Sequence, residues 1–591
     1  MDIFSLLTMF GGLALFLYGM NYMGDSLVML SGSKLEKILE KLTGNQLTGL
    51  LLGAGVTAVI QSSSATTVMV VGFVNSGIMK LRQAVGVIMG ANIGTTVTSW
   101  LLSLTGVSGD NLFLKFLKPS SFSPILAVIG IILIMLKKND TNKKNIGGIM
   151  LGFAILMFGM ETMSDAVAPL AQNEAFTSVF TAFSNPILGM IIGAVLTAII
   201  QSSSASVGIL QALCLTGIVS FGSAIPIIMG QNIGTCVTAL ISSLGANKNA
   251  KRASFIHLYF NLIGTILFMI VFYSINSFVH FEFLSQPASA AGIAVIHSLF
   301  NIGCAIVLFP FGNGLVKLAT LTVRDKKDTP ELEDERPEGL KALDERFLDR
   351  PSFAISICRS TTVEMAKTAR DSFKLAMKVL NNYSKEDAQR VIEMEQLVDD
   401  YEDQLGTFLV KLSGHDLTRQ DSRTLSILLH VLNDFERISD HAINVIEAMQ
   451  KLIDGGENFT QEAKEELIAF SKPVSDILDK TVEVFEKDDL EKAKEVEPLE
   501  EVIDDLCMEM KQRHINRLRA GVCSIEAGLR LEDILTNYER VSDHCSNVAV
   551  SLIEINADEF GTHAYINVKV KENDPWFQEE YSSMKEKYML P

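Results

Sequence analysis

Two long stretches of this chain contain neither Asp nor Glu, residues 41–109 and residues 175–281. Both are strongly apolar and include segments long enough to cross a lipid bilayer. A carrier driven by protons usually keeps a titratable side chain inside the membrane, most often a carboxylate. The missing carboxylates therefore argue against proton coupling. His257 and His297 are the nearby alternatives, although a single His in a helix is more often a packed core residue than a proton relay.

Other absences exclude further classes of protein. The seven cysteines form no Cys-x-x-Cys pair, so we expect reduced thiols and a cytoplasmic location for the soluble half. The N-terminus has no basic region before its apolar run, so it does not have the pattern of a cleavable signal peptide. The sequence shows no nucleotide-binding glycine loop and no nucleophile–base arrangement, and we expect no enzymatic activity.

Charge is divided unevenly along the chain. Residues 1–320 carry 15 Lys and Arg against 10 Asp and Glu, a net of +5, which leaves −23 for the remainder of a chain with a formal charge of −18. This step separates an apolar membrane half (1–319) from a charged, soluble half. Without a concentrated basic face, nucleic acid is not an expected partner.

One tetrapeptide, Gln-Ser-Ser-Ser, occurs at residues 61–64 and again at 201–204. A shift of 140 residues superimposes these copies and also Asn92-Ile-Gly-Thr95 on Asn232-Ile-Gly-Thr235. We infer a tandem duplication, with repeats at 1–140 and 141–245. Internal repeats in a membrane chain are typical of transporters whose substrate site lies between the repeats.

Helix lengths predict how each repeat crosses the bilayer. The arms on either side of each tetrapeptide are too short to span about 30 Å of hydrocarbon, so residues 46–79 and 186–219 are predicted to be re-entrant hairpins. An amphipathic segment, residues 34–41, is expected at the interface. Complete spans are predicted at 3–24, 84–104, 122–136, 146–168, 224–244, 255–276 and 289–310.

Three spans per repeat make the two repeats inverted. In this topology thirteen basic residues fall on one side, which the positive-inside rule makes cytoplasmic: Lys34, Lys37, Lys41, Lys80, Arg82, Lys137, Lys138, Lys143, Lys144, Lys248, Lys251, Arg252 and Lys317. Lys115 and Lys118 fall on the other side. We therefore expect the N-terminus outside, the C-terminus inside, and the two serine tips meeting near the midplane.

The tips combine groups that suit an anion. Helix N-termini present free backbone N–H groups and the positive end of the helix dipole, and Ser hydroxyls and Gln or Asn amides add donors. The hairpins contain no Lys or Arg, so a co-bound sodium ion would supply the missing positive charge. The alternative interpretation is that the serines only hold packed helices together.

The soluble half also contains a duplication. After a polar segment with two prolines that we interpret as a linker (320–350), Phe435-Glu-Arg-Ile-Ser-Asp-His441 recurs as Tyr538-Glu-Arg-Val-Ser-Asp-His544. We expect two three-helix units within 351–560, followed by a tail at 561–591. Acidic residues four apart share a helix face, where they attract a cation or form a solvated acidic surface. The metal hypothesis concerns Glu436, Asp440, Glu539 and Asp543, with further oxygens from Glu395, Asp399, Glu500 and Asp504.

The paired QSSS and NIGT motifs resemble those of the type II sodium–phosphate cotransporters over residues 1 to about 310. This resemblance implies an all-α, polytopic inverted-repeat fold that imports inorganic phosphate with sodium through the plasma (inner) membrane. It assigns the substrate to Gln61, Ser62, Ser63, Ser64, Asn92, Gln201, Ser202, Ser203, Ser204 and Asn232. The sodium hypothesis concerns Thr66, Thr67, Thr95, Thr96, Ser206 and Thr235. Unlike the animal members, this sequence has no continuing Ser/Thr run at Ala205-Ser206-Val207.

The soluble half resembles the PhoU family of phosphate-signalling proteins, whose E-x-x-x-D helices carry metals. This implies a regulatory role with a divalent or iron-type metal. Two rivals remain open: a carrier of another oxyanion, such as sulfate or a dicarboxylate, and a phosphate sensor that does not transport. A homodimer and phosphate-signalling proteins are further partner hypotheses beside membrane lipid.

Overall fold

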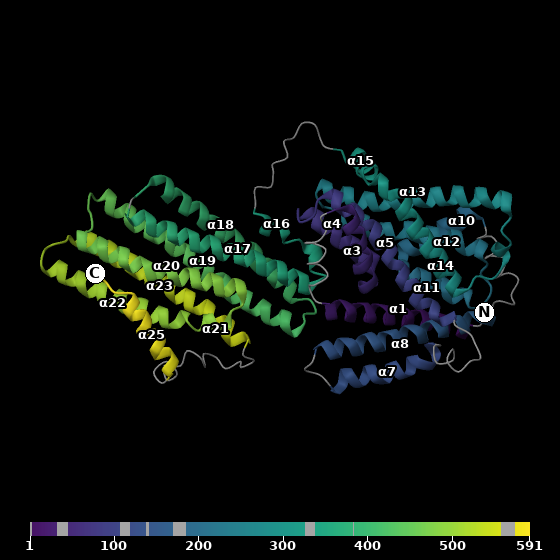
Figure 1. Ribbon diagram of the computed structural model, residues 1–591, viewed down its shortest axis with the longest axis horizontal. Coiled ribbons are helices and arrows are strands. Elements are labelled where there is room, and N and C mark those ends of the chain that lie inside the picture. Colours follow the sequence, from purple (N-terminus) through teal and green to yellow (C-terminus); the bar gives the residue numbers. More distant parts are fainter. Residues whose placement is uncertain are drawn as a thin grey trace. The chain divides into compact units, whose positions relative to one another are not determined.

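The computed structural model describes residues 3–31, 45–106, 119–136, 141–169, 185–324, 337–381, 383–556 and 574–591. These residues are almost entirely helical, and no strand longer than an isolated bridge occurs among them. They form two compact units, Met1–Phe347 (unit 1) and Leu348–Pro591 (unit 2) (Figure 1). The all-α class expected from the sequence is confirmed.

Unit 1 is built from apolar helices. Their bounds are α1 (Ile3–Ser31), α3 (Gln46–Ile60), α4 (Ser63–Asn75), α5 (Leu81–Ser103), α7 (Pro119–Leu136), α8 (Thr141–Val167), α10 (Pro186–Ile200), α11 (Ser203–Cys214), α12 (Phe221–Ser242), α13 (Lys248–Val279), α14 (Ala290–Leu308), α15 (Gly312–Thr322) and α16 (Glu338–Ala342). Within the described residues, 6 helical segments are long and apolar enough to cross a membrane. The seventh predicted span, 122–136, is a shorter apolar helix. The predicted amphipathic segment 34–41 and both Lys115 and Lys118 lie outside the described residues.

The first helices of the two repeats, α1 and α8, lie side by side in close contact (Figure 1). A Cβ added to Gly19 in α1 would lie 2.3 Å from the backbone nitrogen of Leu156 in α8, and one added to Gly159 would lie 2.3 Å from that of Phe16. The 140-residue shift relates these two glycines, so each repeat contributes the same residue to the contact between α1 and α8. Small residues let membrane helices approach closely and gain packing energy. The duplication thus produces a nearly symmetric contact between α1 and α8.

Glycines also fix the hairpin arms to the helices that carry the NIGT motifs. A Cβ on Gly53 of α3 would lie 2.3 Å from the carbonyl oxygen of Val87 in α5. Its counterpart Gly193 of α10 would meet the carbonyl oxygen of Ile227 in α12 at 2.1 Å. Each serine tip is therefore attached to a long helix of its own repeat.

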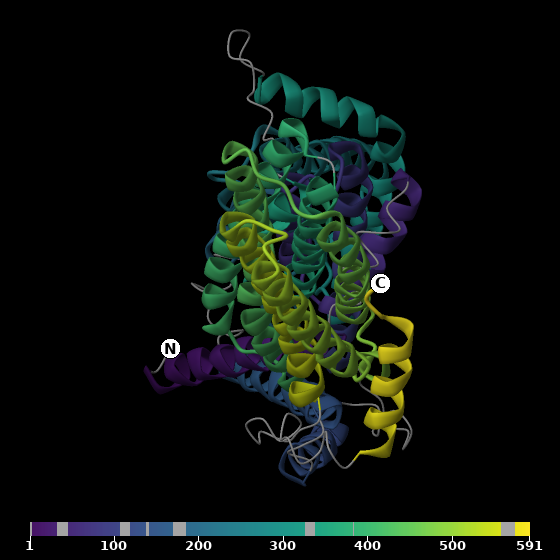
Figure 2. The same ribbon diagram turned by 90° about the vertical axis from the view of Figure 1, so that its left-hand side faces the viewer.

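Unit 2 contains amphipathic helices that bury a common core. They are α17 (Pro351–Asn381), α18 (Lys385–Ser413), α19 (Arg419–Asp454), α20 (Gln461–Lys487), α21 (Leu490–Ala493), α22 (Val496–Arg519), α23 (Ile525–Asn556) and α25 (Pro575–Lys587). Helices α17, α18 and α19 pack together, as do α20, α22 and α23, which gives the two expected three-helix groups (Figure 2).

The two groups join along α19 and α23. Nδ1 of His544 lies 2.9 Å from Oδ1 of Asp434, and Nδ1 of His441 lies 2.7 Å from Oδ1 of Asn537. A shift of 103 residues relates both pairs. Each histidine of the duplicated motif therefore contacts the other copy.

Residues that the composition marks as a linker are packed within unit 1. Leu340 is 2 % exposed and Phe347 is fully buried. Asp344 accepts a hydrogen bond of 2.7 Å from Nδ2 of Asn75, at the end of α4. The segment before Leu348 is thus part of the membrane unit's structure.

Candidate functional site

The first QSSS tip is a tight reversal between two short helices. Gln61 ends α3 in a left-handed conformation, with φ at 62°, and Ser62 is extended. Oγ of Ser62 caps α4 by accepting from the backbone N–H of Ala65 at 3.2 Å. The α3 and α4 arms are tied by a hydrogen bond of 2.9 Å between the hydroxyls of Thr57 and Thr66. The tetrapeptide therefore contains the C-cap of α3 and the N-terminus of α4.

The second tip repeats this geometry. Gln201 has φ at 59°, Ser202 caps α11 through the N–H of Ala205, and the hydroxyls of Thr197 and Ser206 are 2.8 Å apart. Two copies with the same backbone and the same caps indicate that the motif specifies the reversal locally.

The two tips meet. Oγ of Ser64 donates to the carbonyl oxygen of Gln201 at 3.3 Å, and Oγ of Ser204 donates to the carbonyl oxygen of Gln61 at 3.5 Å. The N-terminal ends of α4 and α11 are thus close together, with serine hydroxyls from both repeats between them. Ser63 and Ser203 are buried beside them, at 3 % and 4 % exposed. Two helix N-termini and several hydroxyls at one place suit an anion.

The hydroxyls of the predicted sodium set mostly donate within their own helices. Thr67 donates to the carbonyl oxygen of Ser63, Thr95 to that of Ala91 and Thr235 to that of Gln231. Thr66 and Thr96 do the same, at 3.1 Å and 2.7 Å. A hydroxyl that donates in this way keeps oxygen lone pairs for a cation. Asn92 and Asn232 likewise donate to their own helices, at 3.0 and 2.9 Å.

Two buried glutamine amide oxygens at the site can accept further hydrogen bonds. Among the described residues, Oε1 of Gln61 and Oε1 of Gln231 are buried without a hydrogen-bond partner. Nε2 of Gln231 donates to the carbonyl oxygen of Ser206 at 3.0 Å, which places this glutamine at the second tip. Sequence reasoning missed Gln231. A comparison of the two repeats could have found it, because the matching position in the first repeat holds Ala91.

The two histidines considered as proton relays, His257 and His297, lie on α13 and α14. His257 and His297 are at most 1 % exposed, and neither ring nitrogen of either residue has a hydrogen-bond partner among the described residues. The carbonyl oxygen of His257 accepts from Sγ of Cys236, one residue after the second NIGT motif. Both side chains are thus buried within unit 1.

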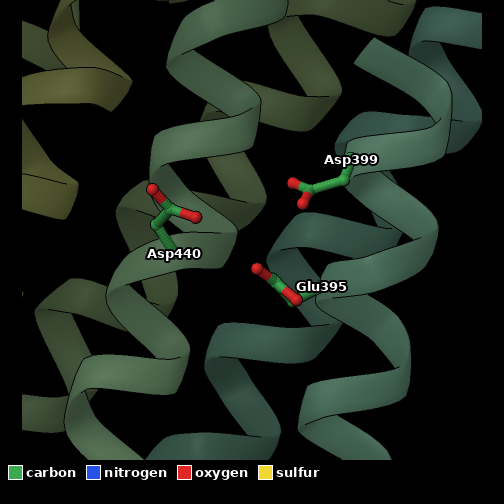
Figure 3. A group of neighbouring side chains, drawn as sticks. All are labelled: Glu395, Asp399 and Asp440. Atoms are coloured by element: carbon green, nitrogen blue, oxygen red, sulfur yellow. The ribbon is translucent and has the colours of Figure 1, made fainter. Parts of the chain in front are cut away.

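A separate acidic group lies in unit 2. Glu395 and Asp399 of α18 and Asp440 of α19 each offer an oxygen, and these oxygens lie within 4.8 Å of one another. Figure 3 shows the carboxylates of the two helices turned toward one another. The matching group is Glu500 and Asp504 of α22 with Asp543 of α23. Three carboxylate donors fit a hard or iron-type cation.

The other two predicted ligands are placed differently. Oε2 of Glu539 forms an ion pair of 2.7 Å with Nζ of Lys511, so this carboxylate is already neutralised. Glu436 lies beside Asp440 and near Asp399, outside the three-oxygen group. Six of the eight predicted ligands thus lie in the two groups, and their role in holding a metal stays a prediction.

The mutual repulsion of these carboxylates contributes to shifts in their pKa values. Burial, followed by the charges of Asp399 and Asp440, raises the pKa of Glu395. Burial and then Asp440 raise the pKa of Glu436 to about 7. At Glu539 burial acts in the same direction, but Lys511 outweighs it and the pKa is lowered. A cation in the first group would relieve the repulsion that these shifts record.

Comparison with known proteins matches both units. The family model described as Na+/Pi-cotransporter matches residues 15–165 and 155–284. The model described as PhoU domain matches residues 362–449 and 468–552. Each model matches twice, in agreement with the two duplications.

Several relatives are similar over different lengths. The chain is 25% identical over 577 residues to "Putative inorganic phosphate export protein YjbB" of Escherichia coli, covering 95% of this chain and 100% of that one. It is 30% identical over 312 residues to "Uncharacterized protein YqeW" of Bacillus subtilis, covering 53% and 96%. It is 33% identical over 130 residues to rat "Sodium-dependent phosphate transport protein 2A", covering 20% of each chain.

Among solved structures, PhoU from Pseudomonas aeruginosa matches with 20% identity and a TM-score of 0.33, covering 34% of this chain and 96% of that one. The Na+/Pi-cotransporter match and the apolar helices lie in unit 1, which contains the two QSSS tips. The PhoU match lies in unit 2, which contains the acidic groups. The chain is therefore a multi-pass membrane protein that belongs to the Na+/Pi-cotransporter family and carries a PhoU domain.

Proposed function

We propose that this protein couples sodium to the transport of inorganic phosphate, with phosphate held between the two QSSS tips. The observation that carries the proposal is the pair of reciprocal hydrogen bonds between Ser64 and Gln201 and between Ser204 and Gln61. They bring two helix N-termini to one place in an environment without Lys or Arg on either hairpin. The names of YjbB and of transport protein 2A support phosphate as the anion.

Sodium would supply the positive charge that the tips lack. Candidate ligands are the hydroxyls of Thr66, Thr67, Thr95, Thr96, Ser206 and Thr235. The five threonines donate to helix carbonyls and keep a lone pair for a cation, whereas the hydroxyl of Ser206 accepts from that of Thr197 and has one lone pair left. The printed name of transport protein 2A supports sodium dependence.

The direction that we propose is inward, because a sodium gradient directed into the cell drives a symported anion the same way. The inverted topology, with re-entrant tips, an N-terminus outside the cell and a cytoplasmic unit 2, belongs to this proposal. The name of YjbB describes export, so direction is measured separately from coupling. We assign a regulatory role to unit 2, with the two acidic groups as its metal sites.

Uptake of labelled phosphate into proteoliposomes tests transport and coupling. We expect accumulation with an inward sodium gradient, and none when choline replaces sodium at constant pH or when a proton gradient acts alone. Competition by sulfate or succinate as strong as that by phosphate would favour another oxyanion. Phosphate binding without accumulation would favour a sensor. Uptake rates compared in right-side-out and inside-out vesicles under the same sodium gradient measure whether transport favours one direction.

Ser63→Leu and Ser203→Leu test the tips. Each removes a buried hydroxyl, a loss of about 1–3 kcal/mol, and fills the space between the helix ends. We expect both to abolish uptake while the protein folds. The matched control is Thr162→Val, which removes an exposed hydroxyl that donates to its own helix. Normal uptake in both leucine variants would remove the tips from the substrate path.

A further inference from the structure

The far end of the first tip helix is attached to the last residues of unit 1. Asn75 closes α4, and its Nδ2 donates to Oδ2 of Asp344 at 2.7 Å. Oδ1 of Asn75 also accepts from the backbone N–H of Asn247, the N-cap of α13, at 2.8 Å. Asp344 is 8 % exposed, and its carboxylate accepts from the backbone N–H of Arg346 and pairs with that guanidinium at 2.6 Å.

The same segment reaches the second NIGT helix. Nε of Arg346 donates to the carbonyl oxygen of Ser242, the last residue of α12, at 2.8 Å. One arginine thus links the carboxylate that holds α4 to the end of α12. We call Asp344, Arg346 and Phe347 the anchor.

Phe347 occupies a space that a glycine leaves open. Its ring is fully buried and packs against the ring of Phe73 at a tilt of 45°, with centroids 5.6 Å apart. A Cβ on Gly72 would come within 2.8 Å of Cε1 of this ring. The repeat-related residue in α11 is Ala212, whose methyl packs in the core with Phe16 and Met160. Asn75 likewise corresponds to Leu215. The first repeat therefore differs from the second at the two positions that receive the anchor.

The second hairpin is held in another way. Its base pairs with the loop before α14 through backbone bonds, from Ala288 N–H to Val219 oxygen at 2.7 Å and from Phe221 N–H to Gln286 oxygen at 3.1 Å. The second hairpin also has a side-chain tether, because Nε2 of Gln211 donates to the carbonyl oxygens of Ser99 and Ala290 at 3.0 Å and 2.9 Å. Among the described residues, the anchor formed by Asp344, Arg346 and Phe347 holds the first hairpin. It also comes directly before Leu348, where unit 2 begins.

We propose that Asp344, Arg346 and Phe347 are positioning residues, which set the first QSSS tip by holding its helix at the opposite end. α4 has 13 residues, so a displacement at Asn75 is carried along a rigid element to Ser63. The anchor fixes α4 relative to α12 and α13, and thereby fixes the distance between the two tips. This inference rests on the proposed function, because it concerns the same tips.

The test uses the full chain and two readouts. Phe347→Ala empties the ring's space, and Gly72→Ala inserts the methyl group that the second repeat carries. The matched control is Gly55→Ala in the same hairpin, where a Cβ would meet nothing within 4 Å. Amide hydrogen exchange over residues 61–75 is measured first. We expect exchange to be about tenfold faster in Phe347→Ala and Gly72→Ala, and unchanged in Gly55→Ala and over residues 201–214.

Uptake then separates positioning from general damage. Both variants should lower the maximal rate of sodium-driven phosphate uptake at least about fivefold. Gly72→Ala combined with Phe347→Leu should recover toward the rate of Phe347→Leu alone, because the smaller side chain makes room for the methyl group. Wild-type rates and exchange in the single variants would overturn the proposal. Additive losses in the double variant would do the same. Absence of uptake in the wild-type chain would count against the proposed function, while the exchange result would still decide on the anchor.

Discussion

Gln61 and Gln201 adopt left-handed backbone, with φ at 62° and 59°, although neither is glycine. This conformation costs a residue with a Cβ about 1 kcal/mol. Glycine would accept it readily, so the side chain must be retained for another reason. The hydrogen bonds between the tips reach only the backbone oxygens of these residues. The side chain of Gln61 donates from Nε2 to the carbonyl oxygen of Ala58 at 2.6 Å and leaves its Oε1 buried without a partner among the described residues.

Gln61→Gly should therefore separate stability from transport. The loss of backbone strain and the greater freedom of glycine in the unfolded chain nearly cancel, each at about 1 kcal/mol. We expect the unfolding temperature in detergent to stay close to that of the wild type while phosphate uptake is lost. A glycine variant with full uptake would show that the amide has no part in transport.

Glu436 and Glu539 occupy matching positions but should respond to pH in opposite directions. The pKa of Glu436 is raised to about 7, by burial first and then by Asp440, so a metal-free chain loses stability as the pH rises from 5 through 7. Glu436→Gln should reduce this loss in the presence of a chelator. The pKa of Glu539 is lowered because Lys511 outweighs burial, so its ionised form stabilises the fold above pH 5. Glu539→Gln should therefore destabilise at pH 7. Thermal unfolding between pH 5 and 8 measures both, and equal pH profiles for the two variants would contradict this assignment.

Helix pairs, not single helices, form the two acidic groups. Glu395 and Asp399 lie four residues apart on α18, which gives them one face, and α19 adds Asp440. The sequence pattern predicts the shared face but not which of two carboxylates on the opposing helix turns toward it. That choice depends on packing partners such as Lys511, which is 28 residues from Glu539.

Asp440→Asn combined with Asp543→Asn should remove bound metal from the purified full chain. Elemental analysis measures the content, and the chelator-dependent fall in unfolding temperature should disappear with it. Asp400→Asn is the control, because Asp400 is an exposed carboxylate on the same helix as Glu395 and Asp399. A wild-type chain without metal that is indifferent to chelators would leave these groups as a solvated acidic surface.

At the scale of the whole chain, the sequence predicted much of the architecture. The shifts of 140 and 103 residues identify the repeats because duplicated segments retain their polar residues at the site. Features that break the repeat escaped this reasoning, above all Gln231 and the pair Gly72 and Asn75. The anchor escaped it as well. Its charged surroundings have the composition of a linker, and composition does not reveal a partner almost 270 residues away.

Thiol labelling tests the orientation of the whole chain. Six of the seven cysteines are buried, and Cys523 in unit 2 is partly exposed. If unit 2 lies in the cytoplasm, a membrane-impermeant maleimide should label Cys523 in inside-out vesicles and not in intact cells. Cys523→Ser should remove this signal. Labelling from outside intact cells would reverse the topology.

The buried position of Phe347 also limits the length of the connection between the two units. α17 begins at Pro351, so residues 348–350 alone lie between a fixed aromatic ring and the first helix of unit 2. Four backbone steps extend to at most about 14 Å, whatever orientation unit 2 adopts. A short tether keeps a tethered partner at a high local concentration, which falls as the tether lengthens. If unit 2 regulates transport as proposed, inserting residues into this junction should weaken the regulation, because a longer tether lowers the local concentration of unit 2.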